Sequence, residues 1–271
     1  MKKIVLFDMD GTLTPARKAM DSNIAKSLFR LSRAGFDIGI ISGSGMNYIL
    51  EQCSVFFNLY ADRISDLKIY PCNGTKYYVW DRKLSEAKQK YCQSIRSELG
   101  PEKLKHVLNS LLKYQIDLMN NYKFSNRFNY TGTFLDYRES LINWCPIGRN
   151  ANFSDRAVFE DMDEYFKIRE KFAKVLGKDP TFSGLAIKIG GSTSFDIYPH
   201  GWDKTFPLGD NLEISELHNY EIYFVGDRCD EGGNDYELFE YVRKQNVARA
   251  FSTTGPEQTE KIIEKLICEA A

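Results

Sequence analysis

Two carboxylates lie two positions apart near the start of the chain, at Asp8 and Asp10, directly after the apolar run of residues 4–7. If the strand continued, side-chain alternation would point both the same way, and Gly11 lets the chain turn immediately afterwards. Paired like charges repel unless a cation or a shared proton compensates them. The pair therefore predicts a hard divalent cation, Mg²⁺, and its alternative is a solvated Asp-rich turn.

The elements around this pair predict a βαβ unit. Residues 4–7 indicate a buried parallel strand, and open α/β sheets bind ligands beyond the carboxyl ends of such strands. Asp21 is a candidate N-cap for a helix with apolar residues at helical spacing, which ends at Gly35. Residues 36–41 form a second apolar strand, so the first two strands are expected to be parallel.

The second strand ends in the turn Ser42-Gly43-Ser44-Gly45, and a helix is predicted at residues 47–52. Backbone N–H groups of such a turn and a helix N-terminus can hold a phosphate. An ordinary Ser/Gly turn after a strand is the alternative, and the turn alone does not decide between them.

A further strand of this kind comes late in the chain. Residues 222–226 are mostly apolar and end at Asp227, which is followed by Gly232-Gly233-Asn234-Asp235. A carboxylate at the end of this strand can reach an ion beside Asp8, and Asp235 can orient the groups around that ion. The last predicted helix, residues 257–268, covers the sheet.

The sequence changes character at about residue 84. Residues 85–112 are charged and helical in pattern, and residues 130–144 alternate like antiparallel strands. One long helix is predicted over residues 154–176, and the next two strands are expected at 185–189 and 194–198. This mixture of helices and antiparallel strands differs from the flanking α/β segments and indicates a separate domain.

We therefore expect an α/β fold in which an α+β cap domain with an antiparallel sheet interrupts a core with a parallel sheet. The predicted core comprises residues 1–83 and 199–271, and the predicted cap comprises residues 84–198.

Composition narrows the class of protein. The chain has 271 residues, 43% of them hydrophobic, and a formal net charge of −1, which argues against nucleic-acid binding and against disorder. The six cysteines are scattered and the three histidines are dispersed, so reduced thiols are expected and a zinc site is not. The apolar run at the N-terminus is too short for a signal peptide, and no run is long enough to span a membrane. We expect a cytoplasmic protein.

The run from Asp8 to Thr14, Asp-Met-Asp-Gly-Thr-Leu-Thr, resembles motif I of the haloacid dehalogenase (HAD) superfamily. This resemblance implies a HAD-like Rossmannoid core in which Asp8 is a nucleophile that becomes an aspartyl-phosphate and Asp10 is the general acid/base. A carboxylate can attack phosphorus when a metal neutralises the phosphoryl oxygens, so the chemistry agrees. Further superfamily motifs are matched by three other parts of the core, namely Ser44, Lys204, and Asp227 with Asp235.

Within the superfamily, the predicted cap resembles the eukaryotic-type phosphomannomutases in the order and spacing of its motifs. The matching stretches are residues 136–138, 145–149, 154–156, 190–196 and 201–204. The resemblance implies that Arg17 contacts the substrate at the edge of the core. In the cap it implies that three arginines bind the distal phosphate, namely Arg138, Arg149 and Arg156. It also implies that Ser194 and Asp196 bind sugar hydroxyls or phosphate.

The arginines also suit phosphate recognition on chemical grounds, because a guanidinium binds a phosphate dianion through two parallel hydrogen bonds. The alternative is that each is a surface arginine paired with Asp136, Asp155 or Glu160. Two departures from the family pattern stand out. Ser42 replaces a usual glycine, and Tyr241 with Lys244 occupies the place of a carboxylate and a threonine that bind a second cation in some relatives.

The resemblance implies an isomerase that interconverts mannose 6-phosphate and mannose 1-phosphate, with the preference for mannose or glucose phosphates left open. It further implies a hexose 1,6-bisphosphate activator, Mg²⁺ bound by Asp8, Asp10 and Asp227, and a homodimer through the caps. Small hexose phosphates are the expected partners, with no nucleic acid and no membrane. A HAD sugar-phosphate phosphatase is the first alternative, since it would use the same core motifs. A catalytically silent sugar-phosphate binding protein is the second.

Overall fold

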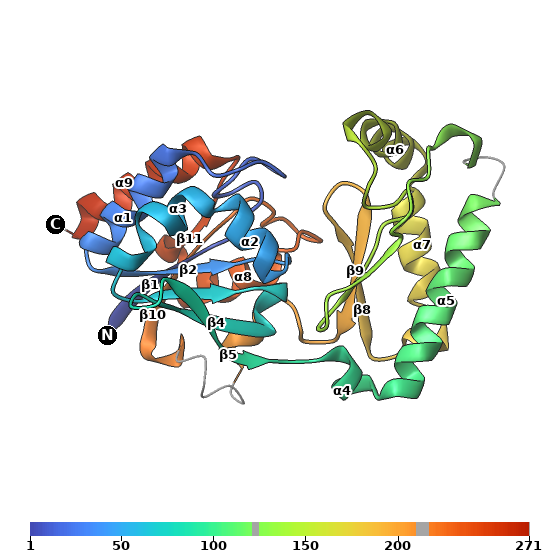
Figure 1. The fold of residues 1–271 in the computed structure, drawn as a ribbon, viewed down its shortest axis with the longest axis horizontal. Helices are drawn as coiled ribbons and strands as arrows, with labels where there is room; N and C mark the ends of the chain where they lie inside the picture. The colour runs from blue at the N-terminus through green and yellow to red at the C-terminus, as the bar shows by residue number, and fades with distance from the viewer. Residues whose placement is uncertain (121–124, 210–216, 271) are drawn as a thin grey trace. The chain divides into compact units, whose positions relative to one another are not determined.

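The computed structural model describes residues 1–120, 125–209 and 217–270, which form two compact units (Figure 1). The core consists of Met1–Cys92 with Gly201–Ala271, and the cap of Gln93–His200. Over these described ranges, every helix is too short or too polar to cross a bilayer.

The core contains a seven-stranded sheet with the order β11-β10-β1-β2-β3-β4-β5. Its first five strands in this order are parallel and the last two add an antiparallel hairpin. The strands are β1 (Lys2–Phe7), β2 (Phe36–Ile41), β3 (Leu67–Tyr70), β4 (Lys76–Asp81), β5 (Glu86–Cys92), β10 (Tyr220–Gly226) and β11 (Ala250–Ser252). Phe7 lies in register with Val225 of β10 and Ile40 of β2, so the carboxyl ends of these three strands meet at one edge.

Helices cover both faces of this sheet, as the continuous apolar run of β1 predicts. Val5 and Phe7 pack into a hydrophobic cluster with residues of α1 (Ser22–Arg33), α2 (Met46–Gln52), α3 (Ser54–Leu59) and α9 (Pro256–Ala270). Ile4 and Leu6 point to the other face, where α8 (Tyr236–Gln245) packs. The Asp21 side chain accepts a hydrogen bond from the Asn23 N–H and caps α1, which confirms this predicted helix start.

The hairpin of β4 and β5 corrects the sequence prediction, which placed a helical segment from residue 85 and a domain boundary at residue 84. Because β5 pairs with β4 along its length, the core extends to Cys92. The outer strand is exposed at most positions and carries charged side chains, so it lacks the apolar alternation that marks a half-buried strand. The pairing shifts register between Tyr77 and Tyr78, and this bulge leaves Lys90 without a partner on β4.

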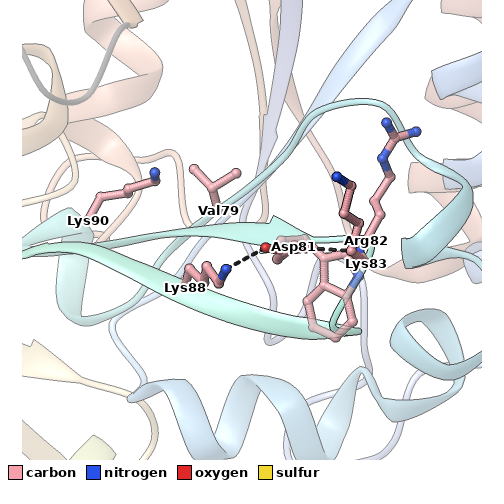
Figure 2. Close-up of a pocket in the computed structure, with 7 residues that line it drawn as sticks. Val79, Asp81, Arg82, Lys83, Lys88 and Lys90 are labelled. Carbon is pink, nitrogen blue, oxygen red and sulfur yellow. Dashed lines mark hydrogen bonds and ion pairs between the residues drawn. The ribbon is translucent and has the colours of Figure 1, made fainter.

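The hairpin also lines a hollow of about 350 Å³ on the core (Figure 2). Its lining side chains are Val79, Trp80, Asp81, Arg82, Lys83, Lys88 and Lys90. Lys88 pairs with Asp81 at 2.6 Å, as Figure 2 shows, and the hydrogen bonds to Asp81 lower the pKa of this carboxyl to about 2. None of the predicted site residues lines this hollow, whose charge is mostly positive.

The cap contains a four-stranded antiparallel sheet with the order β6-β7-β9-β8. Its elements are α4 (Ile95–Leu99), α5 (Pro101–Met119), β6 (Leu135–Tyr137), β7 (Ile142–Trp144), α6 (Phe153–Phe166), α7 (Ile168–Leu176), β8 (Leu185–Gly190) and β9 (Ser194–Pro199). Trp144 stacks on Phe195 with ring centroids 4.9 Å apart, and its indole N–H donates to Gln115 Oε1 of α5 at 2.7 Å. Phe172 of α7 contacts the same indole, so α5 and α7 cover this apolar face. The separate parallel and antiparallel sheets confirm the predicted fold class.

One predicted cap helix is wrong in its length. Residues 154–176 form two helices, α6 and α7, because Lys167 adopts a left-handed conformation with φ 51°. The Asp163 carboxylate accepts hydrogen bonds from both the backbone N–H and Nε of Arg169, each at 2.7 Å, and closes the corner. Helical spacing continues across the break, and a non-glycine residue in this conformation leaves no pattern in the sequence.

Candidate active site

Asp8 follows β1 and lies beside the end of β10, where its backbone N–H donates to Val225 O at 2.9 Å. Its side chain is buried, with 3% of the residue exposed. Lys204 Nζ donates hydrogen bonds to Asp8 Oδ1 and to Asp235 Oδ1, and both Lys204 and Asp235 are fully enclosed. The predicted nucleophile, lysine and supporting carboxylate therefore form one buried ionic array.

Local structure explains how Lys204 reaches this array. The loop after β9 contains Asp203, whose Oδ1 accepts hydrogen bonds from the Thr205 backbone N–H at 2.8 Å and from its hydroxyl at 2.6 Å. The neighbouring Trp202 is buried against Phe206, with ring centroids 5.6 Å apart. These contacts anchor the loop on both sides of Lys204.

The carboxylates of Asp8, Asp227 and Asp235 offer oxygen atoms that all lie within 4.8 Å of one another. Glycines make this approach possible. A Cβ atom on Gly11, which has φ 88°, would lie 2.3 Å from Asp227 Oδ2, and one on Gly226 would lie 2.7 Å from Asp235 Oδ2. The backbone at Gly11 and at Gly226, the last residue of β10, thus lies directly against the carboxylates.

This cluster holds more negative charge than Lys204 compensates. Burial, followed by repulsion from Asp235 and Asp227, raises the pKa of Asp8 well above its ordinary value against the opposing effect of Lys204. Burial and Asp235 raise the pKa of Asp227 to about 6. Burial alone would lower the pKa of Lys204, but Asp235 and Asp8 outweigh it and hold this pKa above its usual range. The lysine stays charged, and a hard cation fits the all-oxygen donor set.

Asp235 differs from the other two carboxylates because both of its oxygens already have donors. Oδ1 accepts from Lys204 and Oδ2 accepts from the Arg228 backbone N–H at 3.1 Å. This arrangement suits the predicted orienting role of Asp235 better than direct ligation of an ion.

Asp10 accepts its hydrogen bonds from residues outside this ionic array. Its Oδ1 accepts two hydrogen bonds, from the Arg17 backbone N–H at 3.1 Å and from the Tyr48 hydroxyl at 3.2 Å. Arg17 is exposed and has a left-handed backbone with φ 61°. The sequence did not single out Tyr48, because an aromatic residue on a short helix is normally a packing residue.

The turn after β2 is braced by its own hydroxyl and by a neighbouring loop. Ser42 Oγ accepts from the Ser44 backbone N–H at 3.0 Å, so the serine that departs from the family pattern has a structural contact. The Asn73 backbone N–H donates to Ser42 O at 2.8 Å, and its side-chain Nδ2 donates to Trp202 O at 3.4 Å. Asn73 has φ 60° and links the turn to the segment that carries Lys204. This residue also went unnoticed in the sequence.

On the cap, a polar row runs across the sheet face opposite Trp144. The strand register aligns Asp136 with Asn143, Asn143 with Asp196, and Asp196 with Lys188, one residue from each strand. Asn143 Nδ2 donates to Asp196 Oδ1 at 2.7 Å. Gly190 leaves room for Asp196, because a Cβ there would lie 2.4 Å from Asp196 Oδ2. Ser194 lies two residues before Asp196 and so on the same face.

Two of the predicted arginines join this row. Arg138 Nε and Arg149 Nε both approach Asp136 Oδ2, at 2.9 Å and 3.3 Å. Arg149 Nη1 also donates to Asn143 Oδ1 at 2.8 Å, which makes Asn143 the bridge between Arg149 and Asp196. The predicted pairing with Asp136 is thus present, but two guanidinium groups share this one carboxylate. Asn143 was missed because its place is visible only in the strand register.

Arg156 is the most buried of the predicted cap arginines, with 6% of the residue exposed. It donates to Ala151 O at 3.0 Å, Arg149 O at 2.8 Å and Thr193 Oγ1 at 2.6 Å. These bonds fix the Arg149 loop and the turn before Ser194 to the start of α6. The structure therefore brings all five predicted cap residues to one region of this unit.

Solved structures share this architecture. A mutant IMP-nucleotidase from Plasmodium falciparum with bound IMP aligns with a TM-score of 0.65 at 14% identity, covering 98% of this chain and 68% of that one. A haloacid dehalogenase-like hydrolase from Bacteroides thetaiotaomicron aligns with a TM-score of 0.55 at 16% identity, covering 98% and 100%. At these identities the likeness shows the fold, which is HAD-like.

Sequence comparison identifies the family within this class. The model of the eukaryotic phosphomannomutase family matches residues 25–269. Phosphomannomutase of Saccharomyces cerevisiae is 36% identical, covering 97% of this chain and 93% of that protein. Phosphomannomutase 1 of Homo sapiens is 36% identical, with coverages of 87% and 82%, and phosphomannomutase of Spinacia oleracea is 35% identical, with 95% and 93%. The chain belongs to the eukaryotic phosphomannomutase family.

Proposed function

We propose that this protein is a phosphomannomutase, an isomerase that interconverts mannose 6-phosphate and mannose 1-phosphate. The observation that carries the proposal is the buried array of Asp8, Lys204 and Asp235, with Asp10 held two residues beyond the nucleophile. Family membership supports the same reaction.

Asp8 is the nucleophile in this proposal. Its free carboxylate oxygen forms a bond to phosphorus of a hexose 1,6-bisphosphate, and the bond from phosphorus to the sugar oxygen breaks. Asp10 gives a proton to the departing oxygen and removes one from the accepting hydroxyl in the reverse half of the cycle. Lys204 holds Asp8 Oδ1, so the other oxygen is the one that attacks. The hydroxyl of Ser44 and the exposed Arg17 contact the substrate.

Mg²⁺ is the proposed metal, held by the side chains of Asp8 and Asp227 and by the backbone carbonyl of Asp10. When bound, it neutralises charge on the phosphoryl oxygens, and Asp235 orients its surroundings. The fit rests on the cluster of carboxylate oxygens and on the raised pKa values of Asp8 and Asp227.

The cap supplies recognition in this proposal. Arg138, Arg149 and Arg156 bind the phosphate that is not reacting, and Ser194 and Asp196 bind sugar hydroxyls or phosphate. The ion pairs of Arg138 and Arg149 with Asp136 support this role, because they gather two guanidinium groups at one place on the cap sheet. A phosphatase needs no grip on a second phosphate, which is why the mutase is preferred to a sugar-phosphate hydrolase.

The remaining proposals concern partners and location. A homodimer through the caps is supported by Leu112 and Ile116, which lie one helical turn apart on α5 and are 48% and 58% exposed. A hexose 1,6-bisphosphate is the proposed activator that first phosphorylates Asp8. A cytoplasmic location is supported by the six cysteines, all of which are free thiols.

The test mixes purified protein, Mg²⁺, mannose 1-phosphate and a trace of glucose 1,6-bisphosphate. Mannose 6-phosphate and inorganic phosphate are measured in the same samples over time. Formation of mannose 6-phosphate that depends on the bisphosphate supports the mutase. Inorganic phosphate as the sole product would overturn it in favour of the hydrolase, and no product of either kind would leave only the silent binding protein.

A further inference from the structure

Tyr48 lies on α2, one turn after the Ser42–Gly45 loop, and its hydroxyl donates to Asp10 Oδ1 at 3.2 Å. The Arg17 backbone N–H donates to the same oxygen at 3.1 Å. The other oxygen of this carboxylate, Oδ2, accepts no hydrogen bond from any residue that the structure describes. Both donors therefore act on one side of the carboxyl group.

Two donors on one oxygen restrict rotation of the carboxyl group about its Cβ–Cγ bond. A terminal carboxylate torsion is otherwise broad, so an aspartate without such contacts samples many orientations. Arg17 belongs to the loop that follows Asp10, whereas Tyr48 comes from a helix on the next strand connection. Tyr48 is therefore the donor that ties Asp10 to a separate element of the core.

Packing places the Tyr48 ring independently of its hydroxyl. The ring is half-buried against the large hydrophobic cluster of the core, and the adjacent Ile49 of the same helix is fully buried. A phenylalanine at this position would keep the apolar contacts of the ring and remove the hydroxyl that donates to Asp10. The substitution therefore tests the hydroxyl without taking the ring out of the core.

We propose that Tyr48 is a positioning residue that, with the Arg17 N–H, holds Asp10 Oδ1 and so presents Oδ2 as the atom that exchanges the proton with the sugar oxygen. The inference rests on the acid/base role of Asp10 in the proposed function. In the transfer step, the bond from Asp8 to phosphorus forms, the bond from phosphorus to the sugar oxygen breaks, and the proton on Oδ2 passes to that oxygen.

The proposed positioning role of Tyr48 predicts that the effect of removing its hydroxyl depends on the leaving group. A sugar oxygen is a poor leaving group and needs the proton, whereas p-nitrophenolate leaves readily without one. Tyr48→Phe should lower kcat for conversion of mannose 1-phosphate to mannose 6-phosphate about tenfold, less than the roughly 10²–10⁴-fold that acid/base catalysis contributes in full, with little change in KM. The burst of p-nitrophenolate that accompanies phosphorylation of Asp8 should stay within about twofold of the wild type, because this step needs Asp8 but not the proton.

Tyr78→Phe is the matched control. Tyr78 lies on β4 of the same unit and donates its hydroxyl to Gln89 Oε1 at 2.7 Å, so the variant removes the same chemical group far along the sheet from Asp10. Its kinetics should match the wild type on both substrates. Asp10→Asn should reproduce the selectivity of Tyr48→Phe with a larger loss.

Equal losses on both substrates in Tyr48→Phe would assign it a structural role and overturn the proposal, as would wild-type kinetics on mannose 1-phosphate. A wild-type enzyme that only hydrolyses mannose 1-phosphate would overturn the proposed mutase without affecting this test. Release of mannose from mannose 1-phosphate would then be compared with the burst of p-nitrophenolate.

Discussion

The core site and the cap polar row hold charge in different ways. In the core, buried carboxylates outnumber the single lysine, and strand ends and glycines press them together. In the cap, guanidinium groups share a carboxylate on a half-exposed sheet face, and side chains rather than backbone hold them. Buried carboxylates with a fixed geometry suit a site where bonds form and break. Partly exposed guanidinium groups, positioned by hydrogen bonds to neighbouring side chains, suit the binding of a phosphate. Substitutions in the two regions should therefore have different signatures.

Asp8→Asn should have the largest effect. It preserves shape but removes the nucleophile, so turnover of mannose 1-phosphate and of p-nitrophenyl phosphate should both fall at least about 10⁴-fold. Steady-state kinetics on the two substrates measure this loss. Residual activity within tenfold of the wild type on both would show that phosphoryl transfer does not pass through this carboxylate.

Lys204→Met should be next, and its effect should include stability. Removing the lysine leaves Asp8 and Asp235 buried without their cation, which should cost about 3–5 kcal/mol in the free energy of unfolding. Urea unfolding measures this difference. Adding Asp235→Asn should recover part of the loss, since it removes one of the uncompensated charges. An unchanged midpoint in Lys204→Met would contradict the buried ionic array.

Arg149→Ala tests the role of the cap in binding, as opposed to the role of the core in bond making. Loss of a charge-assisted phosphate contact should lower mutase kcat/KM about 100-fold, while hydrolysis of p-nitrophenyl phosphate stays within about twofold. Arg149→Lys should recover activity only in part, because lysine keeps the charge but not the two-pronged geometry. Comparable losses on both substrates would count against a role in binding the second phosphate.

The smallest expected effect is a pH dependence of stability without metal. The pKa of Asp227 is raised from 3.8 to about 6 in the folded protein, so the folded state binds this proton more tightly than the unfolded state. Its contribution to stability is complete below about pH 4 and is lost as the pH rises through about 6. In EDTA, the Tm difference between wild type and Asp227→Asn should change in that direction, and Mg²⁺ should abolish the change. A constant difference would contradict the raised pKa.

The sequence predicted those parts of the molecule whose signal is local. β1, β2, β10 and α1 follow from apolar runs and a cap residue, and Asp8, Asp10 and Asp227 follow from their places at strand ends. Lys204 was found only by family resemblance, since one lysine in a loop has no local signature.

The missed features depend on tertiary structure. β5 is an exposed edge strand, and its many charged residues led to the wrong prediction of a helix. Lys167 has a left-handed backbone that ends α6, although the helical spacing of apolar residues continues past it in the sequence. Asn143 joins the cap row only through strand register, and Tyr48 reaches Asp10 only because α2 follows the turn after β2. Such contacts can be predicted only when the pairing of the strands is known.

The most direct test of the division between the two regions is to locate the phosphoryl group on the protein. The enzyme is mixed with glucose 1,6-bisphosphate and Mg²⁺, quenched rapidly, and treated with borohydride, and the site of reduction is identified by mass spectrometry. The account predicts a modified Asp8 in the wild type and, at a slower rate, in Arg149→Ala. Modification of any other residue, or a mutase that turns over with Asp8 never modified, would contradict it.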